Sequence, residues 1–264
     1  MSLRFQSRPA LIAYVTCGDP SLDVTRAVVL AAIDAGADVV ELGVPFSDPI
    51  ADGPVIQRAS ERALRSGTTL KDVLALAREV RAAKPKAGLI IFSYLNPVLR
   101  MGLVRFCAAA ADAGVDGALL TDLTVDEAGD YIASMRSRNL ATVFLAAPTS
   151  TDARLTKIAA ASRGFVYAVS RTGVTGTRED ISEDAQQLVH RLRKFTKLPV
   201  AVGFGVSTPE QFVAVGAWAD AAVIGSAIVE RIENNLGREA QAVAAFIGSL
   251  KRHSALTTQS AREG

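Results

Sequence analysis

Three carboxylates, Glu41, Asp48 and Asp52, lie within a stretch of twelve positions. Glu41 interrupts the apolar run from Val39 to Val44, whereas Asp52 belongs to an Asp-Gly-Pro turn. A carboxylate inside a buried strand is costly unless a partner satisfies it or a reaction uses it. The cluster therefore indicates acid–base chemistry. The alternatives are an interior Arg or Lys partner for Glu41, a turn-forming role for Asp52 and a capping role for Asp48.

Two glycine-rich turns near the end of the chain are typical of a phosphate site. Gly203-Phe204-Gly205 follows one apolar run, and Gly225-Ser226 follows the next and begins a short helical segment. Glycines let backbone N–H groups approach an anion, and a helix N-terminus adds a favourable dipole. Either one alone could be an ordinary turn. Together they predict that the ligand is a small phosphate ester.

The segment from Ser170 to Gly176 reads Ser-Arg-Thr-Gly-Val-Thr-Gly. Its glycines and small polar residues suit a lid that closes over a substrate and excludes water. An ordinary surface loop is the alternative.

The chain lacks the residues that several other chemistries need. The two histidines, His190 and His253, fall in predicted helices away from strand ends, so we expect no catalytic metal. No predicted strand contains Lys, which argues against a Schiff base, and no nucleotide-binding glycine motif is present. The sequence therefore predicts cofactor-free general acid–base catalysis on a phosphorylated substrate.

Short apolar runs alternate with longer amphipathic segments and must position these residues. Most of the runs are apolar throughout, as expected for a parallel sheet covered by helices. The predicted strands are Leu11–Thr16, Val39–Gly43, Leu89–Tyr94, Gly117–Thr121, Thr142–Ala146, Phe165–Ser170, Val200–Gly203 and Ala221–Gly225. The predicted helices are Ser21–Ala35, Leu70–Ala83, Leu103–Ala113, Val125–Arg138, Asp152–Ser162, Asp184–Phe195, Pro209–Val215 and Arg238–Lys251.

A weak internal repeat supports this division. Residues 35–40, Ala-Gly-Ala-Asp-Val-Val, recur at 113–118, and residues 215–220 are a looser copy. In each copy a Gly ends a helix and an Asp precedes a strand. Eight such units favour an α/β fold, a single (β/α)8 TIM barrel with extra short helices in loops 2 and 8, over an open sheet. We assign the barrel to residues 1–252 and a polar, frayed tail to residues 253–264.

Composition narrows the class of protein. The 264 residues are 49% hydrophobic and 21% charged with a formal net charge of +2, and the basic residues are scattered, so we expect no nucleic-acid partner. No apolar stretch has the length of a membrane span, and the N-terminus does not resemble a signal peptide. Cys17 and Cys107 form no motif, which favours a reduced, cytoplasmic setting.

The chain resembles the tryptophan synthase alpha subunit family over nearly its whole length. The long, specific motif is Glu41–Pro54, and the others are Thr16–Pro20, Tyr94–Pro97, Ser170–Gly176, Gly203–Gly205 and Gly225–Ala227. The resemblance implies a TIM-barrel lyase of tryptophan biosynthesis. Its reaction is the retro-aldol cleavage of indole-3-glycerol phosphate to indole and glyceraldehyde 3-phosphate.

The resemblance also implies roles for individual residues. Glu41 falls on the catalytic Glu, Asp52 on the catalytic Asp that binds the indole N–H, and Tyr167 on an active-site tyrosine near the Glu. The implied indole-pocket residues are Tyr14, Phe92, Tyr94, Leu119, Leu145 and the lid residue Thr175, and the implied phosphate-binding residues are Gly176, Gly205, Gly225 and Ser226.

The resemblance further implies a partner, a beta subunit that receives indole through a tunnel within an alpha2-beta2 heterotetramer. The loop from Pro45 to Pro54 and the loop after Asn96 would form the interface. Pyridoxal phosphate would belong to the partner, with no cofactor in this chain. The short N-terminus leaves little room for the family's barrel-closing helix. A stand-alone lyase, another phosphate-binding barrel enzyme and a catalytically idle regulatory subunit stay open as alternatives.

Overall fold

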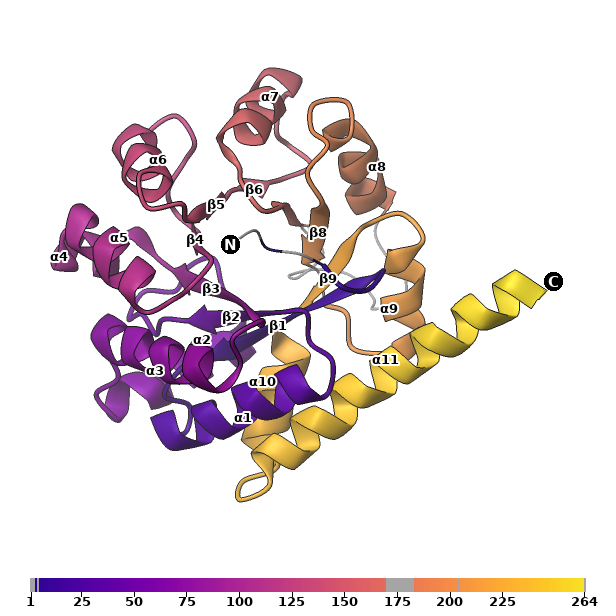
Figure 1. The fold of residues 1–264 in the computed structure, drawn as a ribbon, viewed down its shortest axis with the longest axis horizontal. Coiled ribbons are helices and arrows are strands. Elements are labelled where there is room, and N and C mark those ends of the chain that lie inside the picture. The colour runs from indigo at the N-terminus through magenta and orange to yellow at the C-terminus, as the bar shows by residue number, and fades with distance from the viewer. Residues whose placement is uncertain (1–2, 4, 170–182, 204, 264) are drawn as a thin grey trace.

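The structure is a computed structural model that describes residues 3, 5–169, 183–203 and 205–263, with residues 258–263 described by their backbone only. In this part of the chain, nine parallel strands form one sheet that curls into a ring with the helices outside it (Figure 1). The strands are β1 (Ala10–Thr16), β2 (Val39–Gly43), β3 (Gly88–Ser93), β4 (Gly117–Leu120), β5 (Ala141–Val143), β6 (Leu145–Ala146), β7 (Val166–Val169), β8 (Val200–Gly203) and β9 (Ala221–Ile224).

The ring is a barrel of eight strand positions, because β5 and β6 are two pieces of one strand. The hydrogen-bonded order runs β5-β4-β3-β2-β1-β9-β8-β7-β6, so the two ends of the sheet are joined through a single residue, Phe144. The Phe144 carbonyl accepts a hydrogen bond of 3.1 Å from the Tyr167 N–H and so continues the ladder across the break. The predicted barrel is confirmed.

The helices were largely predicted as well. They are α1 (Leu22–Asp34), α2 (Pro54–Arg65), α3 (Leu70–Ala83), α4 (Leu95–Met101), α5 (Leu103–Asp112), α6 (Gly129–Arg136), α7 (Asp152–Ala161), α8 (Glu183–Leu192), α9 (Pro209–Gly216), α10 (Ser226–Asn234) and α11 (Glu239–Glu263). Helix α3 illustrates why these segments are helical. Thr69 and Asp72 form a capping box at its start, and Leu70, Val73, Leu74, Ala77 and Val80 bury one face.

Three helices lie between a strand and a longer helix that follows it. Helix α2 after β2 and helix α10 after β9 are the extra helices predicted in loops 2 and 8. Helix α4 after β3 was not predicted. Pro97 lies in the first turn of α4, where the missing N–H has no helical partner to lose.

The sequence repeat marks the amino-terminal rim of the barrel. Asp38, Asp116 and Asp220 each precede a strand and accept a backbone N–H at 2.9 Å from the first residues of a neighbouring strand, the donors being Leu11, Leu89 and Val200. Each carboxylate also forms an ion pair: Asp38 with Lys251, Asp116 with Arg81, and Asp220 with both Arg193 and Arg8. The repeated aspartates therefore fasten adjacent strands at the end opposite the loops that carry the carboxylate cluster.

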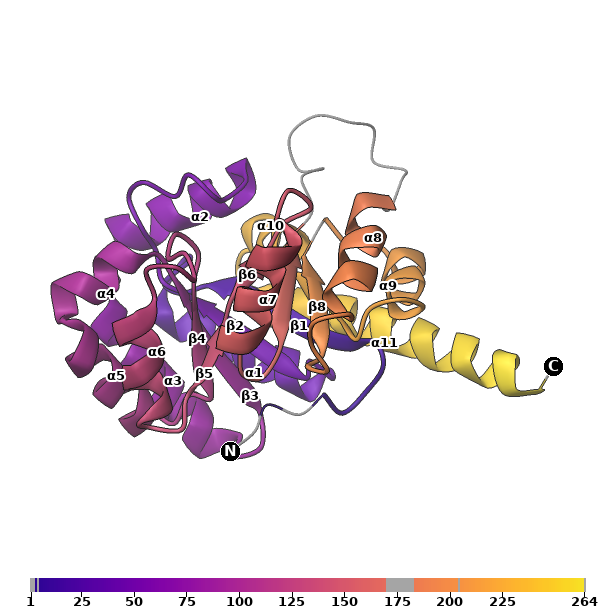
Figure 2. The same ribbon diagram turned by 90° about the horizontal axis from the view of Figure 1, so that it is seen from above.

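The segments before β1 and after α10 lie outside the repeating strand–helix units. The described residues before β1 contain no helix, and Leu3 and Phe5 instead pack against the interior, with Phe5 and Phe165 ring centroids 5.8 Å apart. At the other end, α11 is helical to Glu263, so the predicted tail continues a regular helix, and Figure 2 shows it extending beyond the barrel. The division at residue 252 stays a prediction. Among the described helices, none combines the length and apolarity that crossing a membrane requires.

Candidate active site

Strand alternation places Glu41 inside the barrel. Val39 lies two residues before Glu41 and therefore on the same face of β2, and it belongs to the cluster of apolar side chains that fills the inside of the barrel, here called the interior cluster. Glu41 also pairs in register with Tyr14 of β1. Glu41 is fully buried, and neither carboxylate oxygen has a hydrogen-bond partner among the described residues. Burial raises the pKa of Glu41 from 4.5 to about 8. The side chain therefore carries a proton at neutral pH and can act as an acid.

Asp52 lies at the rim, in the loop between β2 and α2. Its carboxylate accepts a hydrogen bond of 3.1 Å from the Tyr94 hydroxyl, and its backbone carbonyl accepts one of 2.8 Å from the Gln57 side chain. Burial raises the pKa of Asp52 from 3.8 to about 6, and the Tyr94 hydrogen bond partly opposes this rise. Asp52 is therefore mostly ionised at neutral pH. Two carboxylates with pKa values on opposite sides of neutrality suit different steps of acid–base chemistry.

Two interior tyrosines fit against glycines of the adjacent strand. A Cβ added to Gly43 would lie 2.4 Å from the Tyr14 hydroxyl, and one added to Gly203 would lie 2.2 Å from the Tyr167 hydroxyl. Burial raises the pKa of both phenols first. After burial, the largest contribution to the raised pKa of Tyr14 is the negative charge of Asp52. For Tyr167 it is the negative charge of Glu41, followed by that of Asp52. Both hydroxyls therefore stay protonated and lie within electrostatic reach of the carboxylates.

Sequence reasoning missed the part that Gly43 and Gly203 play. Tyr14 pairs in register with Glu41, and Gly43 lies two residues after Glu41 on the same face of its strand. Tyr167 pairs with Ala201, and Gly203 lies two residues after Ala201 in the same way. That spacing was readable once the strands were aligned. It predicts space for a diagonal aromatic side chain.

The predicted indole-pocket residues fall into two groups. Phe92, Leu119 and Leu145 pack in or against the interior cluster, and the rings of Tyr14 and Phe92 meet edge to face with centroids 5.0 Å apart. Tyr94 instead belongs to the rim. Its hydroxyl accepts the Ala51 N–H at 2.9 Å while donating to Asp52. Thr175 lies outside the described residues.

The predicted phosphate residues lie on the turns after β8 and β9. Gly205 has a φ of +43° and open space at its Cβ position, and Gly225 precedes α10. In the described structure no side chain caps the N-terminus of α10, which begins at Ser226. Its first N–H groups are therefore suited to an anion. Gly176 lies outside the described residues.

Comparison with known proteins decides the family. The family model for the tryptophan synthase alpha chain matches residues 1–258. The chain belongs to the tryptophan synthase alpha chain family. A tryptophan synthase alpha chain from Solibacter usitatus is 56% identical over 233 residues, which cover 88% of this chain and 87% of that protein. One from Geobacter sulfurreducens is 47% identical over 253 residues, 94% of each chain.

Solved structures agree with this membership of the tryptophan synthase alpha family. A Mycobacterium tuberculosis tryptophan synthase structure superposes with a TM-score of 0.86 at 38% identity, covering 94% of this chain and 93% of that one. The alpha subunit of tryptophan synthase from Legionella pneumophila gives 0.86 at 33% identity with the same coverage. As a member of this family, the chain is a lyase that cleaves indole-3-glycerol phosphate to indole and glyceraldehyde 3-phosphate, and it works with a beta subunit.

Proposed function

We propose that Glu41 is the proton shuttle of this cleavage and that Asp52 binds the indole N–H. The buried Glu41 acid protonates indole C3, which places positive charge on the ring. The resulting carboxylate then takes the proton of the adjacent glycerol hydroxyl. As the carbonyl forms, the electron pair of the C–C bond returns to the ring, indole leaves, and Glu41 is an acid again.

The observation that carries this proposal is the difference in environment between the two carboxylates. Glu41 is fully buried without a partner among the described residues, whereas Asp52 is held at the rim by Tyr94. A carboxylate that stays ionised beside the indole N–H stabilises the positive charge that develops on the ring, and more strongly where water is excluded. The protonated Tyr167 hydroxyl is proposed to contact the substrate beside Glu41.

The remaining predicted residues bind the substrate in this proposal. The indole ring of the substrate lies against Tyr14, Phe92, Leu119 and Leu145. Tyr94 lies at the edge of this pocket, where its hydroxyl donates a hydrogen bond to Asp52. The phosphate of the substrate binds to N–H groups of the two glycine turns, at Gly205 and at Gly225 and Ser226. Gly176 would complete the phosphate site, and Thr175 would bind Asp52 from the lid, as the family resemblance implies.

The chain is proposed to need no cofactor of its own, with pyridoxal phosphate in the beta subunit of an alpha2-beta2 heterotetramer. Two exposed apolar side chains support the proposed interface. Ile50 in the Pro45–Pro54 loop is 87% exposed, and Leu99, which follows Asn96 on α4, is 56% exposed. A cytoplasmic location is proposed from the family's biosynthetic role and from Cys17 and Cys107, which are both free thiols.

Substitution of the two carboxylates tests the proposed roles. Glu41→Gln and Asp52→Asn are each expected to abolish indole release, while affinity for glycerol 3-phosphate stays within about threefold because the phosphate turns are unchanged. Asp48→Asn is the matched control in the same loop and should keep wild-type turnover in the isolated chain. Near-normal turnover by either of the first two variants would refute the mechanism.

A cognate beta subunit tests the partner. Indole release is expected to rise when the beta subunit is added, and Ile50→Asp should weaken that activation without lowering the basal rate. A chain that releases indole equally fast with and without a beta subunit would be a stand-alone lyase instead.

A further inference from the structure

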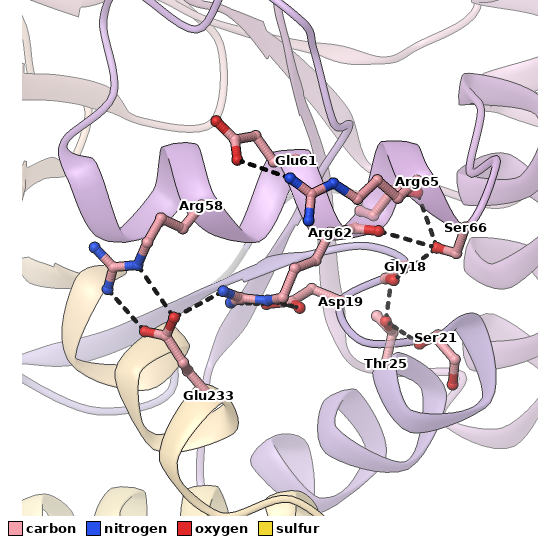
Figure 3. A network of polar contacts seen from close by, with 11 residues as sticks. Gly18, Asp19, Ser21, Thr25, Arg58, Glu61, Arg62, Arg65, Ser66 and Glu233 are labelled. Carbon is pink, nitrogen blue, oxygen red and sulfur yellow. Dashed lines mark hydrogen bonds and ion pairs between the residues drawn. The ribbon is translucent and has the colours of Figure 1, made fainter.

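One ion-pair cluster joins three of the loops around the proposed site. Arg62 of α2 binds both carboxylate oxygens of Asp19 at 2.7 and 2.9 Å, and its remaining nitrogen binds Glu233 at 2.7 Å (Figure 3). Asp19 belongs to the turn after β1, and Glu233 belongs to α10. A single guanidinium therefore connects loops 1, 2 and 8 of the barrel.

Burial and geometry distinguish this pairing from the surface ion pairs of the molecule. Asp19 is only 2% exposed, and the two parallel bonds from Arg62 match the fork of a guanidinium to a carboxylate. Glu233 is held from a second side by Arg58 at 2.8 Å. Removing Arg62 would leave Asp19 as a buried, unpaired charge, so the position of α2 depends on it.

Helix α2 connects the two halves of the proposed site. Its first residue, Pro54, follows Asp52 by two positions. The side chain of Ile56 lies 3.5 Å from the place where a Cβ on Gly225 would stand. Ala59, one turn further along α2, packs in a small apolar cluster with Tyr14 and Val229. The helix thus spaces Asp52 from the phosphate turn.

We propose that Arg62 is a positioning residue for the cleavage reaction: by fastening α2 to Asp19 and Glu233, it fixes Asp52 at the distance from the Gly225 turn that the substrate requires. This inference rests on the proposed roles of Asp52 and Gly225. The substrate must reach both at once, with its phosphate at one and its indole nitrogen at the other. A displacement of α2 by about 1 Å is expected to lower turnover on the order of 100-fold while each separate subsite still binds.

The test compares Arg62→Met with Arg65→Met on the same helix. Arg65 is the matched control, because it is mostly exposed and pairs with Glu61 one turn away at 3.7 Å. For each variant, kcat and KM for indole-3-glycerol phosphate, the affinity for glycerol 3-phosphate and the melting temperature are measured. We expect kcat of Arg62→Met to fall on the order of 100-fold, with glycerol 3-phosphate affinity within about threefold of wild type. Arg65→Met should match wild type in all four.

Two milder variants keep the test decisive if Arg62→Met does not fold. Arg62→Lys retains the charge but not the two-pronged contact, and Glu233→Gln retains the Asp19 pair, so each should lower kcat about tenfold. A lower melting temperature with wild-type kcat in these folded variants would show a purely structural role and overturn the inference. Full activity of Asp52→Asn would instead refute the proposed function, which separates the two failures.

Discussion

Burial of Glu41 makes the wild-type chain less stable at high pH than a Glu41→Gln variant. The folded chain must hold this side chain where neither oxygen has a partner among the described residues, and burial raises its pKa from 4.5 to about 8. Glutamine has nearly the same shape and carries no charge. The substitution therefore removes the cost of ionisation and little else.

The size and sign of the effect follow from proton linkage. Between pH 4.5 and 8 the unfolded chain has released the Glu41 proton while the folded chain keeps it. The contribution of protonated Glu41 to the free energy of unfolding is therefore fully present below pH 4.5 and is lost as the pH rises through 8. At roughly 1.4 kcal/mol for each pH unit, the difference approaches about 5 kcal/mol above pH 8 and about 3 kcal/mol at pH 7. At pH 5 it is below about 1 kcal/mol.

Urea unfolding at pH 5, 7 and 9 measures this difference. Glu41→Gln should unfold at increasingly higher urea than wild type as the pH rises, although it no longer releases indole. Glu61→Gln on α2 is the control, because its side chain is 67% exposed and its effect should stay within about 0.5 kcal/mol at every pH. A gain that is the same at pH 5 and pH 9, or a loss at pH 9, would refute the reasoning.

Two further substitutions probe contacts that shape the site. Tyr94→Phe removes the hydrogen bond that lowers the pKa of Asp52, so that pKa should rise above about 6 and the acid limb of the kcat/KM profile should move to higher pH; an unmoved limb would contradict the role of Tyr94. Gly203→Ala places a Cβ 2.2 Å from the Tyr167 hydroxyl, so we expect activity to fall at least about tenfold and stability by about 1–3 kcal/mol, as measured by indole release and urea unfolding. Gly129→Ala, with open space at its Cβ position, is the matched control, and equal behaviour of the two alanine variants would contradict the predicted clash.

Much of the fold was predictable because its signals are local. Apolar runs of strand length, the capping box at Thr69 and the Gly-to-Asp repeats all lie within a few residues of the element that they specify. Two details of the fold were not predicted. Pro97 reads as a helix breaker yet lies in the first turn of α4, and a single residue, Phe144, divides the fifth barrel strand.

The site was predictable only in part. The sequence indicated that Glu41 is buried, because an apolar strand surrounds it, and that glycine turns follow β8 and β9. It did not indicate that Tyr94 binds Asp52, 42 positions away, or that the Tyr167 hydroxyl occupies the space left by Gly203. These contacts depend on which strands become neighbours and on how the loops above them pack.

Sequence alone therefore determined the residue types and the order of the elements, since these depend on neighbours along the chain. Tertiary structure decided the electrostatics and the spacing of the site. The pKa of Glu41 depends on full closure of the barrel around it, and Arg62 meets Asp19 and Glu233 across separations of 43 and 171 positions. Desolvation and long-range ion pairs exist only when distant segments pack together, so no local pattern records them.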